Sequence, residues 1–248
     1  MIKAVTLDCW GTLLLDSPGS DDERYWRPRL AGFERILKAT GVQVRFDELK
    51  RAYARSGHEL ARIWLTRRDV PVDHHVTALL EALDPTLPER LAPGVLAALI
   101  QAYAHPALVV PPAVDGGART ALEELAARGL ALGVVSNTMR TPGEVLRQIL
   151  DRAGLLAPMK VLTFSDECGI RKPDPEIFLL TLRQVGVAPE EAVHVGDDPF
   201  LDVEGARDAG MAVIQVAADG RATAPVKPDA VIRDLHELPA ALERFMAP

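Results

Sequence analysis

Cysteines, long apolar runs and dense basic clusters are all scarce in this sequence of 248 residues. Its two cysteines, Cys9 and Cys168, exclude a framework of several disulfides, and we expect a reducing, cytoplasmic location. No uninterrupted apolar stretch approaches the ~20 residues that span a bilayer, so we expect no membrane partner. The net charge is −7 and no segment is rich in Lys and Arg, so we expect no nucleic-acid partner.

What the sequence does contain, after about residue 130, is a regular alternation of apolar strands and amphipathic helices. The expected strands cover residues 130–135, 161–164, 192–195 and 211–216, and the expected helices cover residues 142–153, 175–185 and 200–209. Almost continuously apolar strands that alternate with helices are typical of a parallel sheet with helices on both faces. The predicted fold class is therefore α/β.

The segment from residue 16 to residue 110 departs from this alternation. Its periodicity predicts helices near residues 21–40, 46–68, 72–83 and 88–104. Pro18 on one side and Pro111 on the other indicate boundaries, so we predict a helical cap domain over 16–110 and a core made of 1–15 and 111–248. Two interpretations stay open: a mobile lid that excludes water and selects substrates, or a helical layer packed rigidly on the sheet.

Polar side chains follow the predicted strands at four places. Asp8, Ser136, Lys172 and Asp197 each lie at or after the end of an apolar strand. In open α/β sheets, ligands bind at the carboxyl edge of the strands. An acid, a hydroxyl group, a cation and a further acid at one edge therefore indicate an active site.

The first of these places leaves three roles open for Asp8: covalent nucleophile, metal ligand or turn-forming acid. Gly11 suits a backbone that turns sharply around a phosphate, because it has no Cβ, and Thr12 adds a hydroxyl group to the same pocket. At the second place, Ser136 and Asn137 either bind a phosphoryl oxygen or cap the following helix.

The third place is the lysine–proline pair Lys172–Pro173. Proline favours extended backbone at the residue before it, and a lysine held in this way is able to neutralise both a carboxylate and a transferring group. We expect the neighbouring Arg171 to be solvated.

The fourth place carries three acids, Asp197, Asp198 and Asp202. Clustered carboxylates repel one another and offer the oxygen ligands that Mg²⁺ prefers, so the cluster and Asp8 together predict a magnesium site. The alternative is a helix N-terminus whose dipole the acids stabilise.

Together these segments resemble the four motifs of the haloacid dehalogenase-like hydrolase superfamily. Residues 8–13 are similar to the first motif, Ser136 to the second, Lys172–Pro173 to the third and residues 196–202 to the fourth. The resemblance implies a Rossmann-like, doubly wound core with a helical cap inserted after the first motif. It also implies a covalent intermediate on Asp8.

The same resemblance implies catalytic roles for Asp8 and Lys172 and a Mg²⁺ cofactor. The metal ligands would be Asp8, the backbone carbonyl of Trp10 and Asp197, with Asp198 and Asp202 as further candidates. Gly11, Thr12, Ser136 and Asn137 would bind the phosphate of a small-molecule substrate.

Trp10 departs from the family pattern. Family phosphatases usually carry an aspartate two residues after the nucleophile as general acid and base, and tryptophan occupies that position here. A positioned acid/base is worth ~10²–10⁴-fold in rate, so alkyl phosphates, whose leaving group needs a proton, would suffer most.

Three functions stay open. The first is a Mg²⁺-dependent phosphatase acting on a small phosphorylated metabolite, weak or specialised because of Trp10. The second is a metal-independent hydrolase like the 2-haloacid dehalogenases, which carry an aromatic residue at this position and release halide without a proton. The third is a non-catalytic protein that binds a phosphate ligand. Asp197 and Asp198 favour the phosphatase, because unneutralised acids would repel a carboxylate substrate.

Arg24, Arg27 and Trp64 are the cap residues that we expect to contact substrate, since arginine grips carboxylates and phosphates. The alternative is that the arginines are exposed charges and that Trp64 anchors the core of the cap. The sequence is compatible with a monomer or a homodimer.

Overall fold

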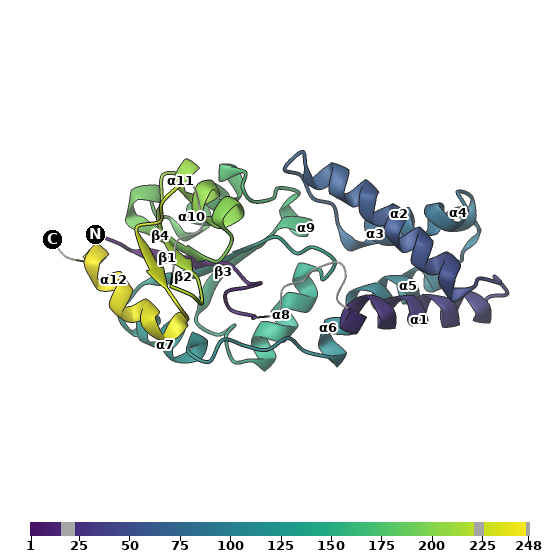
Figure 1. The fold of residues 1–248 in the computed structure, drawn as a ribbon, viewed down its shortest axis with the longest axis horizontal. Coiled ribbons are helices and arrows are strands. Elements are labelled where there is room, and N and C mark those ends of the chain that lie inside the picture. Colours follow the sequence, from purple (N-terminus) through teal and green to yellow (C-terminus); the bar gives the residue numbers. More distant parts are fainter. Residues whose placement is uncertain (16–22, 221–225, 247–248) are drawn as a thin grey trace.

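Residues 1–15, 23–220 and 226–246 are described by the computed structural model, in which a helical bundle lies beside an α/β core (Figure 1). The strands are β1 (Ala4–Leu7), β2 (Ala131–Ser136), β3 (Met159–Phe164), β4 (Ala192–Gly196), β5 (Ala212–Val216) and β6 (Ala230–Ile232). The helices between β1 and β2 are α1 (Glu23–Ala39), α2 (Phe46–Trp64), α3 (Val72–Leu83), α4 (Leu87–Arg90), α5 (Pro93–Ala104), α6 (Pro106–Val109) and α7 (Ala118–Ala127). The later helices are α8 (Gly143–Arg152), α9 (Ser165–Cys168), α10 (Pro175–Val185), α11 (Gly205–Asp208) and α12 (Leu238–Met246), with short 3₁₀ or π turns at η1 (Pro189–Glu191), η2 (Pro199–Glu204) and η3 (Leu235–Glu237).

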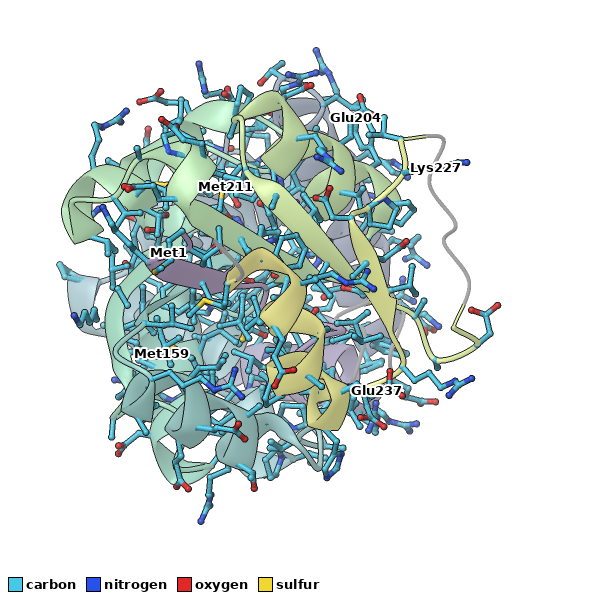
Figure 2. The ribbon with its side chains drawn as sticks, turned by 90° about the vertical axis from the view of Figure 1, so that its left-hand side faces the viewer. Met1, Met159, Glu204, Met211, Lys227 and Glu237 are labelled. Carbon is cyan, nitrogen blue, oxygen red and sulfur yellow. The ribbon has the colours of Figure 1, made fainter. Side chains whose placement is uncertain are left out.

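Within the described residues, six parallel strands form one sheet in the order β3-β2-β1-β4-β5-β6. Three strands begin at the end of the core that is turned away from the helical bundle. This end is marked by Met1 before β1, Met159 at the start of β3 and Met211 before β5 (Figure 2). The carboxyl ends of the strands therefore face the bundle. This arrangement confirms the predicted α/β fold with a doubly wound parallel sheet.

Apolar side chains cover both faces of the sheet. On one face, Val5 and Leu7 of β1 pack in a cluster with residues of α7, α8 and α12. On the other face, Ala4 packs with Phe178 of α10 and Ala206 of α11. Burying a side chain of valine, leucine or phenylalanine size stabilises a fold by roughly 1.5–3 kcal/mol, so these two clusters hold β1 and its carboxyl end in place.

The helices from α1 to α5 have an apolar core of their own, which includes Leu30, Phe33, Leu79 and Tyr103. This cluster is distinct from the two that cover the sheet. It supports a separate cap, although the boundaries at 16 and 110 stay a prediction, and the first boundary, with Pro18, falls outside the described residues. In the described part of the chain no helix is both long and apolar enough to cross a membrane.

Two predicted helices differ from the structure. The helix expected at 200–209 is a π-helical turn, η2, followed by the short α11, because the Val203 amide bonds to the Asp198 carbonyl, five residues back, at 3.2 Å. The helix expected at 88–104 is divided into α4 and α5. Pro93 begins α5, where its missing N–H costs little.

A buried polar seam joins the cap to the loop after β2. Arg29 of α1 donates from Nε to the Tyr103 carbonyl at 2.7 Å and from Nη2 to the Arg140 carbonyl at 3.1 Å. Arg140 donates from Nη1 to the Tyr103 hydroxyl at 2.6 Å, and its Cζ lies 4.0 Å from the Tyr53 ring centroid. Because hydrogen bonds to charged groups gain strength in a buried site, these contacts fix α1 and α5 against the core.

His75 of α3 lies in the same seam, where its ring makes edge contacts with Trp64 and Tyr103. Neither ring nitrogen has a hydrogen-bond partner among the described residues. Burial, with the positive charge of Arg140 and its neighbours, lowers the pKa of His75 to about 3. His75 is therefore neutral in the fold and serves as a packing residue.

We expect acid to destabilise the fold through His75. Below its ordinary pKa of 6.5 the unfolded chain binds a proton that the folded chain does not, so stability falls as the pH drops from 6.5 toward 3. Between pH 7 and pH 5 this effect amounts to about 2 kcal/mol, and His75→Phe should remove it while keeping the ring contacts. Urea unfolding at both pH values measures the difference. His74→Gln, on the exposed side of α3, is the control, and equal pH dependence in wild type and His75→Phe would contradict the prediction.

Candidate active site

Asp8 follows β1 directly and is 7% exposed. Its backbone amide bonds to the Val195 carbonyl of β4 at 2.9 Å, which continues the ladder between β1 and β4 by one residue. Its carboxylate Oδ1 accepts a hydrogen bond from the Cys9 amide at 2.7 Å. Burial raises the pKa of the Asp8 carboxyl to about 7, against the lowering effect of Lys172. The strand end therefore holds a carboxylate in a site that strongly favours a neighbouring positive charge.

Lys172 provides that charge. Its Nζ lies 2.7 Å from Asp8 Oδ1 and 2.6 Å from Asp202 Oδ1, with the lysine 2% exposed. Although burial lowers the pKa of Lys172, the two carboxylates outweigh this effect and raise it above its usual range. The lysine is therefore cationic and joins the first and fourth loops.

Asn137 holds the backbone of Lys172 from the end of β2. Its Oδ1 accepts from the Lys172 amide at 2.9 Å, and its Nδ2 donates to the Lys172 carbonyl at 3.1 Å. The predicted residue thus acts here as a backbone clamp, and it also lines the cavity at Asp8. It is not the helix cap that the sequence left open, because α8 has Pro142 at its N-terminus.

Asp202 uses both carboxylate oxygens within the protein. Besides Lys172, His194 Nε2 lies 3.0 Å from Oδ1, and the Asp198 amide donates to Oδ2 at 3.0 Å. Thr6 Oγ1 lies 2.9 Å from His194 Nδ1, which completes a buried chain from β1 through β4 to η2. Lys172 and His194 outweigh burial and hold the pKa of Asp202 far below its usual value.

Sequence reasoning missed Thr6 and His194. The only signal is a polar residue within each of two otherwise apolar strands, and such a pattern equally fits a side chain that is simply buried. In the structure both residues support Asp202 from beneath the sheet edge.

Asp197 directly follows β4 and faces the turn after Asp8. A Cβ placed on Gly11, which has a φ of +75°, would lie 2.4 Å from Asp197 Oδ2, so only glycine permits this approach. Burial and the charge of Asp202 raise the pKa of Asp197 to about 6. Asp8 and Asp197 are therefore two crowded carboxylates that a divalent cation would stabilise.

Among the described residues, Asp8, Asp197 and Asp202 are placed to hold a metal ion together, because one oxygen of each lies within 4.8 Å of the others. This all-oxygen set fits Mg²⁺. Asp8 and Asp197 suit direct binding best, because the oxygens of Asp202 already accept bonds from Lys172 and Asp198. Asp198 is engaged as well: its Oδ1 accepts from the Phe200 and Leu201 amides at 2.8 and 2.7 Å, as a cap of η2.

A cavity of about 220 Å³ opens above Asp8, and its walls include Trp10, Gly11, Met139 and Asp197. Trp10 is 5% exposed and places an indole where the family's acid would stand. Thr12 and Ser136, both predicted to bind phosphate, are fully buried and do not line this cavity. Their hydroxyl groups have no hydrogen-bond partner among the described residues, so they stay candidates.

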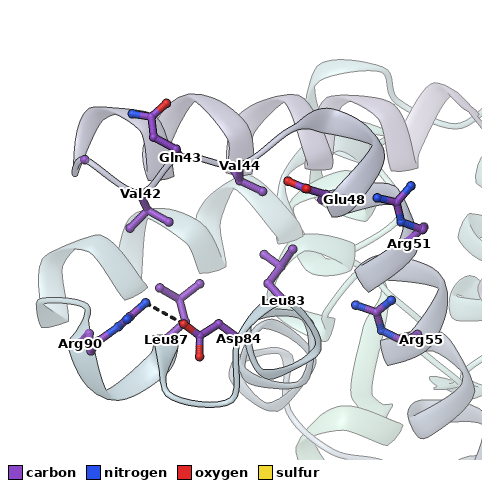
Figure 3. Close-up of a pocket in the computed structure, with 11 residues that line it drawn as sticks. Val42, Gln43, Val44, Glu48, Arg51, Arg55, Leu83, Asp84, Leu87 and Arg90 are labelled. Carbon is purple, nitrogen blue, oxygen red and sulfur yellow. Dashed lines mark hydrogen bonds and ion pairs between the residues drawn. The ribbon is translucent and has the colours of Figure 1, made fainter.

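A larger cavity, of about 610 Å³, lies elsewhere, at the outer end of the cap (Figure 3). Arg51, Arg55 and Arg90 surround its apolar floor, and Arg90 is paired with Asp84 at 2.8 Å. It contains neither Asp8 nor Lys172, so size alone does not identify the reactive site.

The three cap residues expected to contact substrate lie outside the cavity at Asp8. Arg24 and Arg27 are exposed on α1, and Arg27 pairs with Glu23 at 2.5 Å. Trp64, at the end of α2, donates from Nε1 to Asp69 Oδ1 at 2.8 Å and is half-buried. Substrate contact by these side chains stays a prediction.

Arg171 is not solvated, contrary to expectation. It is 5% exposed and donates from Nη1 to Asp69 Oδ2 at 2.7 Å. Asp69 also accepts from the Ser165 hydroxyl. Two backbone bonds run beside this pair, from the Asp69 amide to Gly169 and from the Arg171 amide to Arg67, both at 3.1 Å. The cap is thus attached to the segment that carries Lys172.

Fold and site together define an α/β protein with a helical cap, whose clustered charged side chains lie at the carboxyl edge of the sheet. The chain belongs to the haloacid dehalogenase-like hydrolase family, whose sequence model matches residues 2–210, and it is a hydrolase. This confirms the resemblance seen in the four motifs.

Relatives include proteins of more than one activity. The glyceraldehyde 3-phosphate phosphatase of Methanopyrus kandleri is 31% identical over 87% of this chain and 84% of its own. The phosphoserine phosphatase of Thermus thermophilus is 42% identical over 47% of this chain, but the match spans only 46% of that protein. Among solved structures, a 2-haloacid dehalogenase from Pseudomonas syringae pv. Tomato DC3000 is similar with a TM-score of 0.73, at 27% identity over 99% of this chain and all of that one. An HAD phosphatase from Thermococcus onnurineus has a TM-score of 0.63, at 29% identity over 97% and 98%.

Asp69→Asn should weaken the attachment between cap and core. The substitution leaves the Arg171 guanidinium buried without its counter-charge, and breaking a buried ion pair costs about 3–5 kcal/mol. Urea unfolding should therefore show a loss of about 3 kcal/mol in the free energy of unfolding. Asp151→Asn, at an exposed position of α8, should change it little. Equal stability of the two variants would refute the importance of the pair.

Proposed function

We propose that this hydrolase is a Mg²⁺-dependent phosphatase that acts on a small phosphorylated molecule through an aspartyl-phosphate at Asp8. The observation that carries the proposal is the bridge of Lys172 between Asp8 and Asp202, with Asp197 held against the same turn by Gly11. The relatives named as phosphatases support the reaction class.

The nucleophile in this proposal is Asp8 Oδ2, because Oδ1 accepts the bonds from Cys9 and Lys172. Attack on phosphorus forms the bond from Asp8 Oδ2 to phosphorus, which gives an acyl phosphate, and breaks the bond to the leaving oxygen. Water then hydrolyses the acyl phosphate, which releases phosphate and restores the carboxylate. Lys172 stabilises the negative charge of Asp8 before attack and that of the phosphoryl group during transfer.

Asp8, Asp197 and the Trp10 carbonyl would hold the Mg²⁺. The bound ion would neutralise the phosphoryl oxygens and favour ionised carboxylates at this pair. Asn137 contributes by fixing Lys172, and Gly11 by leaving room for Asp197.

Trp10 in place of an acid favours substrates with good leaving groups. Its indole cannot donate a proton to a leaving alkoxide, so a leaving group of low basicity loses least from the missing acid. We therefore expect natural substrates whose leaving oxygen is stable as an anion. Other phosphate esters should be turned over slowly.

A metal-independent dehalogenase is the second candidate, favoured by the similarity to a 2-haloacid dehalogenase structure and by the aromatic residue at position 10. Against it, Asp8 and Asp197 crowd the cavity with two carboxylates, which would repel a haloacid. A protein that only binds phosphate is the third candidate. The contact of Lys172 with Asp8 favours an enzyme that turns over its substrate, because binding alone does not need a lysine on the nucleophile.

The phosphatase should release phosphate from acetyl phosphate only when Mg²⁺ is present, and EDTA should stop it. Asp8→Asn and Asp197→Asn should each lower turnover by at least ~10³-fold, because they remove the nucleophile or a metal ligand. Asp198→Asn should retain most activity, since asparagine also caps a helix turn. Malachite-green detection of phosphate measures all four proteins. Halide release from 2-chloropropionate that is insensitive to EDTA would instead establish the dehalogenase.

Trp10→Asp should raise turnover of alkyl phosphates by about 10-fold or more if the missing acid limits the reaction. Trp10→Asn is the matched control, because it makes the same space without a proton to give. The ratio of glycerol phosphate to acetyl phosphate turnover is the readout, and it is insensitive to the fraction of folded protein. Equal ratios in the two variants would mean that another group already supplies the proton.

A further inference from the structure

A second cavity, of about 530 Å³, lies beside the cavity at Asp8. Its walls come from Trp64 at the end of α2, from Leu65 and Arg67 just after that helix, and from Phe200 and Leu201 of η2. Lys172 and Leu201 line both cavities. The second cavity therefore continues from the lysine that contacts the proposed nucleophile.

Large apolar side chains stand exposed at this cavity. Leu65 is 85% exposed and Phe200 is 50% exposed, one from the cap and one from the core. Single exposed apolar residues are ordinary on protein surfaces. Two such residues lining one cavity, one from the cap and one from the core, form together with Trp64 a site that would gain free energy by burying an apolar group.

The rim of the cavity is held in place by Arg67. This residue has a φ of +59°, which non-glycine residues adopt rarely. Its carbonyl accepts the Arg171 amide at 3.1 Å, and the Asp69–Arg171 ion pair lies alongside. The contacts between cap and core thus hold Arg67 at its positive φ. Residues held in such rarely populated conformations are often found at ligand-binding sites.

We propose that this cavity binds the organic group of an aryl phosphate, so that the substrate class is phosphate monoesters of phenolic hydroxyl groups. The inference rests on the phosphatase proposed above and identifies its substrate. The ring would contact Phe200 and Leu65, and the Arg67 guanidinium would lie over its π face.

The chemistry of the leaving group supports the same class independently. A phenol has a pKa near 10, as in tyrosine, and leaves as phenolate far more readily than an alkyl alcohol leaves as alkoxide. The reaction then breaks the phosphorus–oxygen bond and releases phenolate, which takes its proton from water. The acid that Trp10 replaces is needed least for such substrates.

Binding of phosphonates tests the cavity without any need for turnover. Isothermal titration with Mg²⁺ present should show phenylphosphonate binding at least tenfold more tightly than methylphosphonate. Phe200→Ala and Leu65→Ala should each reduce that preference about three- to fivefold. Val109→Ala, which truncates an exposed apolar residue at the end of α6 outside this cavity, should keep it.

The outcomes separate this inference from the proposed function. Equal affinity for the two phosphonates, no binding of either, or a preference that both cavity variants retain would overturn the aryl site. Phosphate release from acetyl phosphate alongside any of these results would leave the phosphatase standing. A cavity-dependent preference in a protein that releases phosphate from neither acetyl phosphate nor phenyl phosphate would support the binding site and refute the phosphatase.

Discussion

The position of the Lys172 ammonium between Asp8 and Asp202 is the interaction on which the site depends. A fully buried lysine is stable only with counter-charges, and a buried carboxylate at Asp8 is ionised only with a cation nearby. The ammonium group and the two carboxylates therefore offset the free-energy cost of burying one another's charges. His194 and Thr6 extend this dependence into the sheet, so that β1, β4 and the loop before α10 are joined through charge as well as through packing.

The seam between cap and core is a second constraint on the same loop. Asp69 and Arg171 form a buried ion pair immediately before Lys172, and backbone bonds between 67–69 and 169–171 run beside it. On the other side, Arg29 joins α1 to the loop after β2. These contacts favour the view that the cap supports the loop that carries Lys172.

Much of the core could be predicted from the sequence because its strands are apolar without interruption and its loops carry the polar residues. The same logic placed Asp8, Lys172 and Asp197 at one edge of the sheet. It failed for Arg171, since the partner that buries this charge is Asp69, 102 residues away in the sequence. For the cap candidates Arg24 and Arg27, substrate contact stays a prediction, because helical periodicity does not tell which end of a helix meets the core.

The π-helical turn η2 makes the spacing of the fourth loop part of its chemistry. Asp198 caps the N-terminus of η2, and Asp202, within η2, contacts Lys172. Between them the backbone is π-helical and therefore wider than an α-helix, with a hydrogen bond from the Val203 amide to the Asp198 carbonyl. Each residue of an α-helix turns the chain by about 100°. Loss of one residue here would rotate the Asp202 carboxylate away from the ammonium group that it neutralises. An insertion or deletion between Asp198 and Asp202 should therefore be as damaging as a substitution of Asp202 itself. A homologous chain that keeps the aspartate but not this spacing would lack the contact with the lysine.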